Sequence, residues 1–147
     1  VVRLLPDTLI VDVKEHDRLA VWQVGGKAHV IDAQGIVIPG ADAGRYPRLP
    51  LVVGKGADQA ASDVLPLLAQ RPRLMAKVDA LVRVDERRWD LRLKDGALIQ
   101  LPAVDQESAL IRLDALDQRE RLLDLGFARI DLRTPEEVAV RPSEGAV

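Results

Sequence analysis

The sequence predicts an α+β fold, with a largely antiparallel sheet and helices packed against it. Apolar and polar residues alternate strictly over residues 89–94, and Asp95-Gly96 separates this run from a second apolar run at 97–101. That pattern is typical of a β-hairpin with a type I′ turn. Apolar residues also recur at helical spacing in two longer segments, 58–70 and 110–125. Because these segments do not alternate regularly with strands, a parallel βαβ sheet is not expected.

Strands are also predicted in the first third of the chain. Three segments there are rich in β-branched and other apolar residues: 8–13, 19–24 and 28–32. Gly25 and Gly26 predict a tight turn, and so a hairpin, between the last two. Residues 35–56 are dense in glycine and proline, so we expect a loop that contains short strands at 36–38 and 51–53.

The middle of the chain changes to a helical period. A helix is predicted over residues 58–70, and Pro66 is expected to kink or divide it because proline lacks an N–H and its ring clashes with the preceding turn. Residues 78–84 contain several valines and are predicted to form a strand. Leucines at helical spacing over 110–125 predict one or two helices after the hairpin, and Gly126 is expected to end them.

The chain returns to a strand pattern near its end. Residues 127–133 and 138–141 are predicted to be the last two strands, with a turn at 134–137, and Pro142 is expected to end the second of them. If 138–141 is an edge strand, it presents unpaired N–H and C=O groups to a partner segment. An edge blunted by Glu137 and Pro142 is the alternative, and the residues alone leave both open.

Composition excludes several classes of protein. The chain has 147 residues, 48% of them apolar, which is enough to bury one core. Its 21 basic and 23 acidic residues are interspersed, which argues against nucleic acid or a membrane surface as the main ligand. With no cysteine, disulfides, thiolate metal sites and cysteine nucleophiles are ruled out.

Residues that carry out chemistry are thinly distributed. No serine lies in a nucleophile-elbow motif. His16 lies in a charged stretch, 14–18, that fits a metal ligand set but fits a charged turn between strands better. His29 has no second ligand at usable spacing and is interpreted as a structural histidine. We therefore expect no catalytic, metal-binding or cofactor-binding residue, and a protein that is not an enzyme.

Charged pairs are abundant and are given structural interpretations. Carboxylate pairs such as Asp114 and Asp117 are too common to mark an acid/base site, so they are interpreted as solvated faces. Arg87, Arg88 and Trp89 form a small basic and aromatic cluster that suits stacking on a nucleic-acid base. Their acidic neighbours favour a hairpin flank or a protein contact instead.

Three segments together resemble the periplasmic part of the FtsQ/DivIB family of bacterial division proteins. They are residues 87–96, the helix with leucines at 110, 113 and 116, and residues 130–135 followed by 140–142. In addition, residues 6–15, followed by Ala20-Val21-Trp22, resemble the closing strand of that family's POTRA domain and its passage into the β domain. The resemblance spans nearly the whole chain.

The resemblance implies a single-pass inner-membrane protein of the division septum, with a POTRA domain and a β domain on the periplasmic side. On this basis residues 1–18 are expected to be the C-terminal remnant of the POTRA domain, 19–142 the β domain, and 143–147 a C-terminal tail. The chain begins abruptly in strand-like sequence at Val1. We therefore expect a fragment that lacks the cytoplasmic tail, the membrane helix and most of the POTRA domain.

The resemblance also implies partners. FtsB and FtsL are expected to bind, chiefly through an FtsB segment that adds a strand beside the C-terminal edge, with FtsW, FtsI and FtsK as further partners of the missing part. Backbone groups would then supply affinity and alternate side chains selectivity. Carried over by position, the expected partner-binding residues are Thr134, Glu136, Glu137, Val138, Ala139, Val140 and Arg141, with Arg87 and Arg88 from the hairpin.

Two other functions stay open on the residues alone. One is a different POTRA-bearing envelope protein, of outer-membrane assembly or secretion. The other is a cell-wall-binding module or enzyme, which a deep pocket with converging polar groups would favour.

Overall fold

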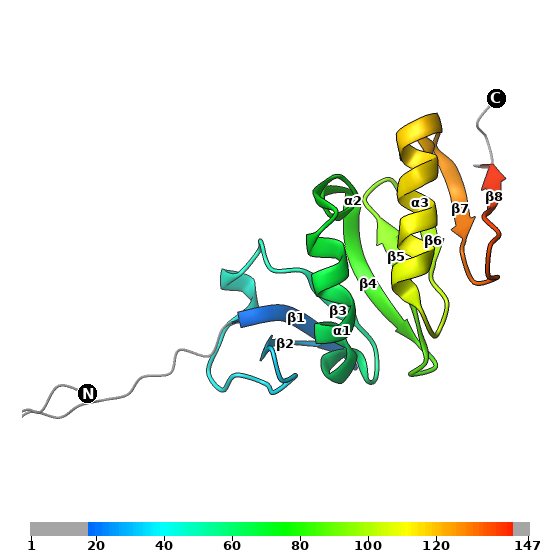
Figure 1. Ribbon diagram of the computed structural model, residues 1–147. Helices are drawn as coiled ribbons and strands as arrows, with labels where there is room; N and C mark the ends of the chain where they lie inside the picture. The colour runs from blue at the N-terminus through cyan, green and yellow to red at the C-terminus, as the bar shows by residue number, and fades with distance from the viewer. Residues whose placement is uncertain (1–17, 143–147) are drawn as a thin grey trace, which may run out of the picture.

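The computed structural model describes residues 18–142 (Figure 1). The strand predicted at 8–13 and the tail at 143–147 therefore lie outside the described residues. The described residues form an α+β fold, as predicted, in which helices pack against one mixed sheet.

The sheet has eight strands in the order β2-β1-β3-β4-β5-β6-β7-β8. Their bounds are β1 Arg18–Val24, β2 Lys27–Asp32, β3 Leu51–Val53, β4 Val78–Val84, β5 Arg88–Leu93, β6 Leu98–Gln100, β7 Phe127–Asp131 and β8 Ala139–Pro142. Neighbouring strands are antiparallel in β1–β2, β4–β5, β5–β6 and β7–β8, and parallel in β1–β3, β3–β4 and β6–β7. Antiparallel pairings are thus the majority, and the parallel ones occur where a longer connection joins the strands.

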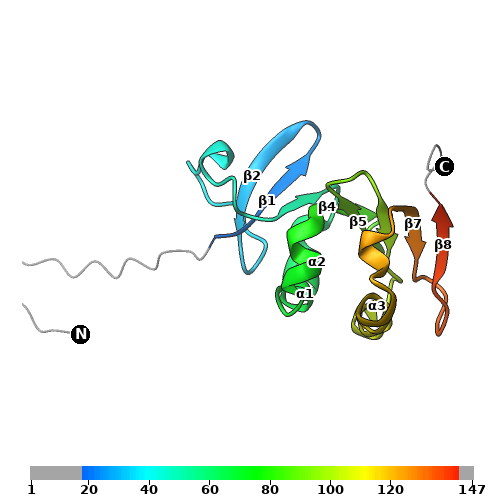
Figure 2. The ribbon, with the colours of Figure 1, turned by 90° about the horizontal axis from the view of Figure 1, so that it is seen from above.

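Three α-helices cover one face of this sheet: α1 Ala57–Ala69, α2 Pro72–Lys77 and α3 Gln106–Glu120. Short 3-10 helices occur at Ala43–Arg45 (η1) and Leu122–Asp124 (η2). Seen from above, α1, α2 and α3 all lie on the same side of the sheet, and its other face carries no α-helix in the described range (Figure 2). The core lies between the helices and the covered face, with fully buried Leu68, Leu81, Leu91, Leu110 and Ile130 among its members.

The hairpin predicted around Asp95-Gly96 is confirmed, but its type I′ turn is wrong. Gly96 has φ +91°, whereas Asp95 is absent from the residues with positive φ, and the Gly96 N–H donates to the carbonyl of Leu93 at 3.0 Å. This is a type I turn followed by a left-handed glycine, the usual three-residue hairpin loop. Pairs of positive φ angles occur instead at Gly25 and Gly26, +58° and +77°, between β1 and β2, and at Asp85 and Glu86, +54° and +56°, between β4 and β5.

The predicted helix over 58–70 is confirmed as α1, but Pro66 does not divide it. Pro66 is exposed, so the carbonyl that loses its helical partner lies on the solvent side. On the opposite side, Val64, Leu65 and Leu68 are buried, and their packing holds the helix together across the missing hydrogen bond. The six-residue α2 was not predicted, because one and a half turns are too short to show a hydrophobic period.

Helix α3 offers a matched test of the core, because Leu113 is 1% exposed and Ile111, two residues away, is 54% exposed. We expect Leu113→Ala to lower the free energy of unfolding by about 2–5 kcal/mol, since it removes buried methyl groups and leaves a cavity. Ile111→Ala is the control and should change it by less than about 0.5 kcal/mol. Urea denaturation measures both, and equal losses would contradict the packing described.

Candidate partner-binding edge

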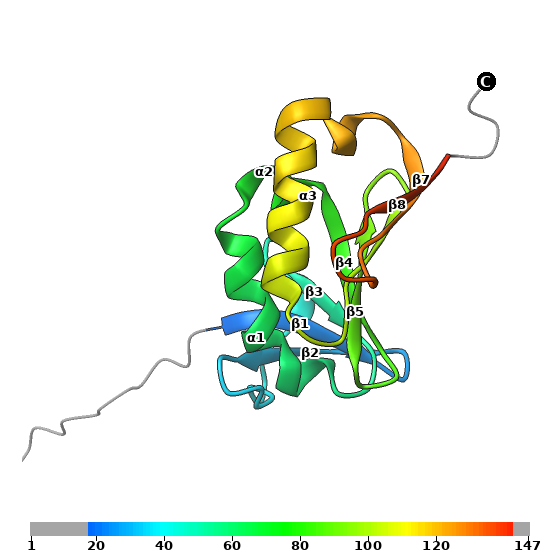
Figure 3. The same cartoon turned by 45° about the vertical axis from the view of Figure 1, so that its right-hand side comes forward.

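The two edge strands of the sheet differ in whether another segment pairs with their outer side. At one end, the segment after β2 folds back along it: Ile38 N–H donates to Val30 O at 2.8 Å, and Asp32 N–H donates to Ile36 O at 3.0 Å. At the other end, β8 pairs with β7 alone within residues 18–142. Figures 1 and 3 show β8 at the far side of the sheet from β2. This unpaired side of β8 is called the β8 edge below.

The pairing of β7 fixes which backbone groups of β8 face outward. Leu132 N–H donates to Gln100 O at 2.9 Å, so Ile130 and Leu132 direct their backbone groups toward β6. Alternation along β7 then directs those of Asp131 toward β8. In the β7–β8 register Asp131 lies opposite Ala139, and Ile130 lies opposite Val140.

It follows that Ala139 exchanges hydrogen bonds with Asp131, whereas Val140 directs its N–H and C=O away from β7. Among residues 18–142, nothing pairs with the N–H and C=O of Val140, which are therefore the donor and acceptor at the centre of the β8 edge. Pro142, two residues on, faces the same way but has no N–H to donate, which ends the edge.

The turn that leads into β8 is held by one arginine of α3. Arg112 donates from Nη1 to Thr134 O at 3.0 Å and to Glu137 O at 2.9 Å, and from Nη2 to Leu132 O at 3.4 Å. The turn closes with Glu137 N–H donating to Thr134 O at 3.2 Å. Glu136 between them has φ +64°, a left-handed conformation in which a non-glycine residue needs such support.

The structure places the residues expected at the C-terminal edge in one continuous segment. Thr134, Glu136 and Glu137 lie in the exposed turn, and Ala139, Val140 and Arg141 lie exposed on β8. Val138 differs because it is half-buried and packs against the core. Its side chain therefore anchors the start of β8 and is less accessible than its neighbours.

Arg87 and Arg88 lie away from β8, because β6 and β7 separate β5 from it. Three strand spacings make this distance about 14 Å. Arg88 Nε is 3.4 Å from Asp90 Oδ1, so it is partly neutralised within its own strand. Both arginines line a small hollow of about 180 Å³ with Ala103.

A larger groove of about 580 Å³ lies beside the β8 turn and includes Val104, Ile111, Pro135 and Glu136 in its lining. Val104 is 77% exposed and adjoins Ala103 of the small hollow. The two hollows thus follow one another from the β8 turn toward Arg87 and Arg88. Sequence reasoning missed this groove, because its apolar residues come from a loop, a helix and a turn that are distant in the chain.

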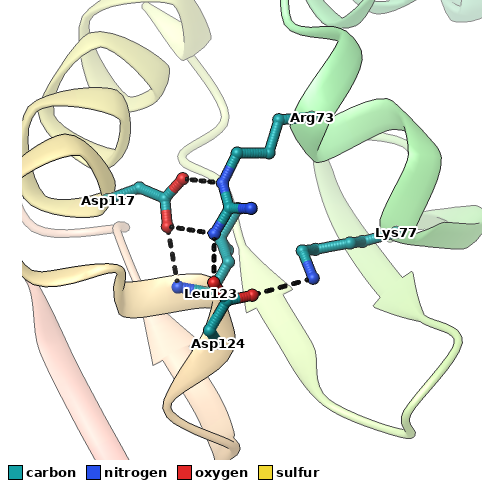
Figure 4. Close-up of polar contacts among 5 residues, drawn as sticks. All are labelled: Arg73, Lys77, Asp117, Leu123 and Asp124. Atoms are coloured by element: carbon teal, nitrogen blue, oxygen red, sulfur yellow. Dashed lines mark hydrogen bonds and ion pairs between the residues drawn. The ribbon is translucent and has the colours of Figure 1, made fainter.

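An ion-pair network at the other end of α3 fixes that helix against α2 (Figure 4). Arg73 Nε donates to Asp117 Oδ2 at 2.7 Å, and its Nη2 donates to Asp124 Oδ2 at 2.6 Å. Lys77 Nζ is 3.1 Å from Asp124 Oδ1. Asp117 Oδ1 also accepts the N–H of Leu123 at 3.0 Å, so this carboxylate joins α3, η2 and α2.

The interpretation of Asp114 and Asp117 as a solvated face is wrong. Asp117 is buried, and Asp114 Oδ2 accepts a hydrogen bond from Arg71 Nε at 2.6 Å. Both partners lie on the α1–α2 segment, which reaches α3 only in the folded chain. Spacing along α3 therefore gave no sign of them.

The network changes the acidity of its members. Burial raises the pKa of Asp117, but hydrogen bonds from Arg73 and from the Leu123 N–H outweigh burial and leave the pKa below its usual value. Hydrogen bonds from Arg73 and Lys77 likewise lower the pKa of Asp124. The same two carboxylates raise the pKa of Arg73.

Acid should weaken this network. A carboxylate with a lowered folded-state pKa adds stability that is complete above its unfolded pKa of about 3.9 and is lost as pH falls through the folded value. We expect wild type to be more stable than Arg73→Gln by a constant margin above about pH 5, and this margin to shrink below about pH 4. Urea denaturation across this pH range measures the margin.

Arg119→Gln removes an exposed arginine for which the described residues show no ion pair, and is the control. Its free energy of unfolding should change with pH as that of wild type does. A margin for Arg73→Gln that stays constant down to about pH 2 would contradict the assignment.

Arg112 should determine how firmly the β8 turn is held. We expect Arg112→Gln to speed amide hydrogen exchange in residues 134–142 by about fivefold, because loss of its carbonyl contacts lowers the local opening free energy by about 1 kcal/mol. Exchange in β4 and β5 should not change. The same exchange measurement on Arg119→Gln gives the baseline, and unchanged exchange in the turn would show that Arg112 does not hold it.

Residues 18–142 contain neither a cluster of metal-ligating side chains nor a helix able to span a membrane. No group of three or more histidine, cysteine, aspartate or glutamate side chains is placed to hold a metal ion in this range. No helix among the described residues is long and apolar enough to cross a membrane.

The sequence is similar to proteins of one known family over most of its length. The family model for the C-terminal region of the cell division protein FtsQ/DivIB matches residues 20–133 of the sequence. A cell division protein FtsQ of Caulobacter vibrioides is 65% identical over 147 residues, which is 100% of this chain and 49% of the relative. FtsQ proteins of Bradyrhizobium diazoefficiens and Zymomonas mobilis are 41% and 38% identical over 99% and 90% of this chain, and 43% and 42% of the relatives.

The chain spans about half the length of these relatives or less. The family match ends before β8, whereas the match to the Caulobacter protein includes it. Because the family model covers residues 20–133 of 147, well over half of the chain, this protein belongs to the FtsQ/DivIB family of cell division proteins.

Proposed function

We propose that this domain is a non-enzymatic scaffold of the division machinery, which binds FtsB, and through it FtsL, by strand addition at the β8 edge. The observation that carries the proposal is the unpaired side of β8 in a chain of the FtsQ/DivIB family. A segment that pairs with Val140 gains main-chain hydrogen bonds that any sequence can make, and its alternate side chains provide selectivity.

The edge is suited to this role because it is formed before a partner arrives. Arg112 holds the turn through three backbone carbonyls, and Val138 packs against the core. A partner therefore does not have to order β8, and the conformational entropy of that ordering does not reduce the affinity. The proposed contact residues are Thr134, Glu136, Glu137, Val138, Ala139, Val140 and Arg141.

The hollows beside the turn suggest how Arg87 and Arg88 take part. A partner chain that leaves the β8 edge at the turn reaches first the groove beside Ile111 and then the hollow beside Ala103. In this proposal Arg87 and Arg88 contact the partner beyond the added strand and not alongside it.

The wider setting is also part of the proposal. The domain acts on the periplasmic side of the inner membrane at the septum, in a longer protein anchored by one membrane helix. Residues 1–18 are the end of its POTRA domain, 19–142 the β domain and 143–147 a tail. FtsW, FtsI and FtsK are proposed to bind other parts of that longer protein. Membership of a cell-division family gives no support to a role in secretion or to a cell-wall-binding module.

Removing the outward donor tests the proposal. We expect Val140→Pro to weaken binding of a soluble FtsB periplasmic segment by at least about tenfold, or about 1.4 kcal/mol, because proline removes the central N–H and its ring obstructs the incoming strand. Val140→Ala keeps the N–H and is the matched control, so it should lose much less. Calorimetry measures both, with circular dichroism to verify folding.

Ala139→Pro is not a clean test, because the N–H of Ala139 is directed at β7. We expect it to loosen β8 itself, which amide exchange would detect. Equal affinity of wild type and folded Val140→Pro would move the interface away from the β8 edge. A wild-type domain that binds no FtsB segment would refute the proposed function.

A further inference from the structure

The helix-free face of the sheet carries a row of arginines that ends at the β8 edge. Alternation along β7 puts Arg129 on the face opposite the buried Ile130. Across the sheet, Arg92 lies opposite Leu98, Leu98 lies beside Arg129, and Arg129 lies opposite Arg141. These residues share one face of β5, β6, β7 and β8, the face that carries no α-helix in Figure 2.

Two members of this row, Arg129 and Arg141, have no ion-pair partner within residues 18–142. Arg92 Nε is 3.4 Å from Asp79 Oδ2. The carboxylate of Asp131 on β7 accepts hydrogen bonds from Arg133, from Nε at 2.9 Å and from Nη2 at 2.8 Å. Arg129 acts on Asp131 only at longer range, by lowering its pKa. Within residues 18–142, neither Arg129 nor Arg141 has an ion pair or a side-chain hydrogen bond.

Arg129 and Arg141 are therefore like charges directly opposite each other on neighbouring strands. Such a pair is destabilising in a sheet, by up to about 1 kcal/mol. Both side chains are exposed, so water and salt reduce the repulsion but supply no attraction. Neither core packing nor an internal ion pair within residues 18–142 accounts for this pair.

The β8 edge would place an acidic side chain of an added strand beside this pair. Side chains of directly opposed residues on neighbouring strands lie about 4.5–5.5 Å apart at Cβ, on the same face. In a strand added beside β8, one side chain therefore lies next to Arg141, and every second side chain from it lies on the same helix-free face. The side chains between them lie beside Val140, on the helix-covered face, where Val140 is 42% exposed and apolar.

We propose that the Arg129–Arg141 pair is a specificity site for a partner strand that alternates acidic and apolar residues. An aspartate or glutamate of the added strand lies against Arg141 and Arg129, and its neighbour in the strand packs against Val140. This inference rests on the proposed strand addition, and it specifies the chemistry of the segment that the edge accepts.

The composition of the face favours a peptide over a polyanionic surface. Asp79 and Asp131 lie among the arginines, so the face has mixed charge instead of a broad basic field. A membrane surface or a nucleic acid would meet these carboxylates as well. A single carboxylate that strand pairing places next to Arg141 would not meet Asp79 and Asp131.

The test removes both charges and compares the result with the same change elsewhere. The variant is Arg129→Gln with Arg141→Gln, and the matched control is Arg48→Gln with Arg119→Gln, two exposed arginines for which the described residues show no ion pair. Binding of the soluble FtsB segment is measured at about 0.05 M and about 0.5 M salt. We expect the variant to bind at least about tenfold more weakly at low salt and to lose most of the salt dependence. The control should bind within about twofold of wild type.

The outcomes separate the inference from the proposed function. If the variant binds as tightly as wild type with the same salt dependence, while Val140→Pro still weakens binding, the arginine site is refuted and strand addition stands. If the variant instead loses binding to phosphatidylglycerol vesicles and keeps FtsB, the pair is a lipid site and the inference is wrong.

A second probe applies if wild type binds no FtsB segment. Two synthetic heptapeptides, one alternating valine with glutamate and one alternating valine with lysine, are titrated into the isotope-labelled wild-type domain. We expect the acidic peptide alone to shift the amide resonances of residues 139–141. Equal responses to both peptides, or none, would overturn the inference.

Discussion

Burial of one face of the sheet beneath α1, α2 and α3 is the interaction on which the rest of the structure depends. The large side chains of β4, β5, β6 and β7 on that face meet the apolar faces of α1 and α3, and burial of this area drives folding. Because α1, α2 and α3 lie on one side of the sheet (Figure 2), the other face has no α-helix over it in the described range. The surface proposed to bind partners is thus a consequence of one-sided packing.

Arginines join α3 to other segments of the fold at its middle and near its C-terminal end. Near its middle, Arg112 binds carbonyls of the β8 turn. Near its end, Asp117 receives Arg73 from α2 (Figure 4). The planar guanidinium, with several donors in fixed directions, suits both tasks. Each contact joins segments that are distant in the chain, and together they hold β8 in a defined position beside the core.

The charged residues divide into those that hold the fold and those that we propose bind a partner. Arg73 and Arg112 are engaged within the domain, whereas Arg129 and Arg141 face each other and pair with no carboxylate among residues 18–142. Sequence spacing did not separate these two classes, because the groups that Arg73 and Arg112 contact are distant from them in the chain. Their difference arises from which strand or helix comes to lie beside them, as the wrong interpretation of Asp117 also shows.

Local pattern determined the order of the strands and helices apart from the short α2, the hairpin at Gly96, and the turn and strand at 134–141, because turn chemistry and side-chain period act between near neighbours in the chain. The two-residue period also showed that alternate residues of 138–141 share a face. Tertiary structure alone decided that β8 is an edge and that Val140, and not Ala139, offers its backbone outward. That choice depends on how β7 divides its hydrogen bonds between β6 and β8, and pairing between strands distant in the chain leaves no signal in either strand's own sequence.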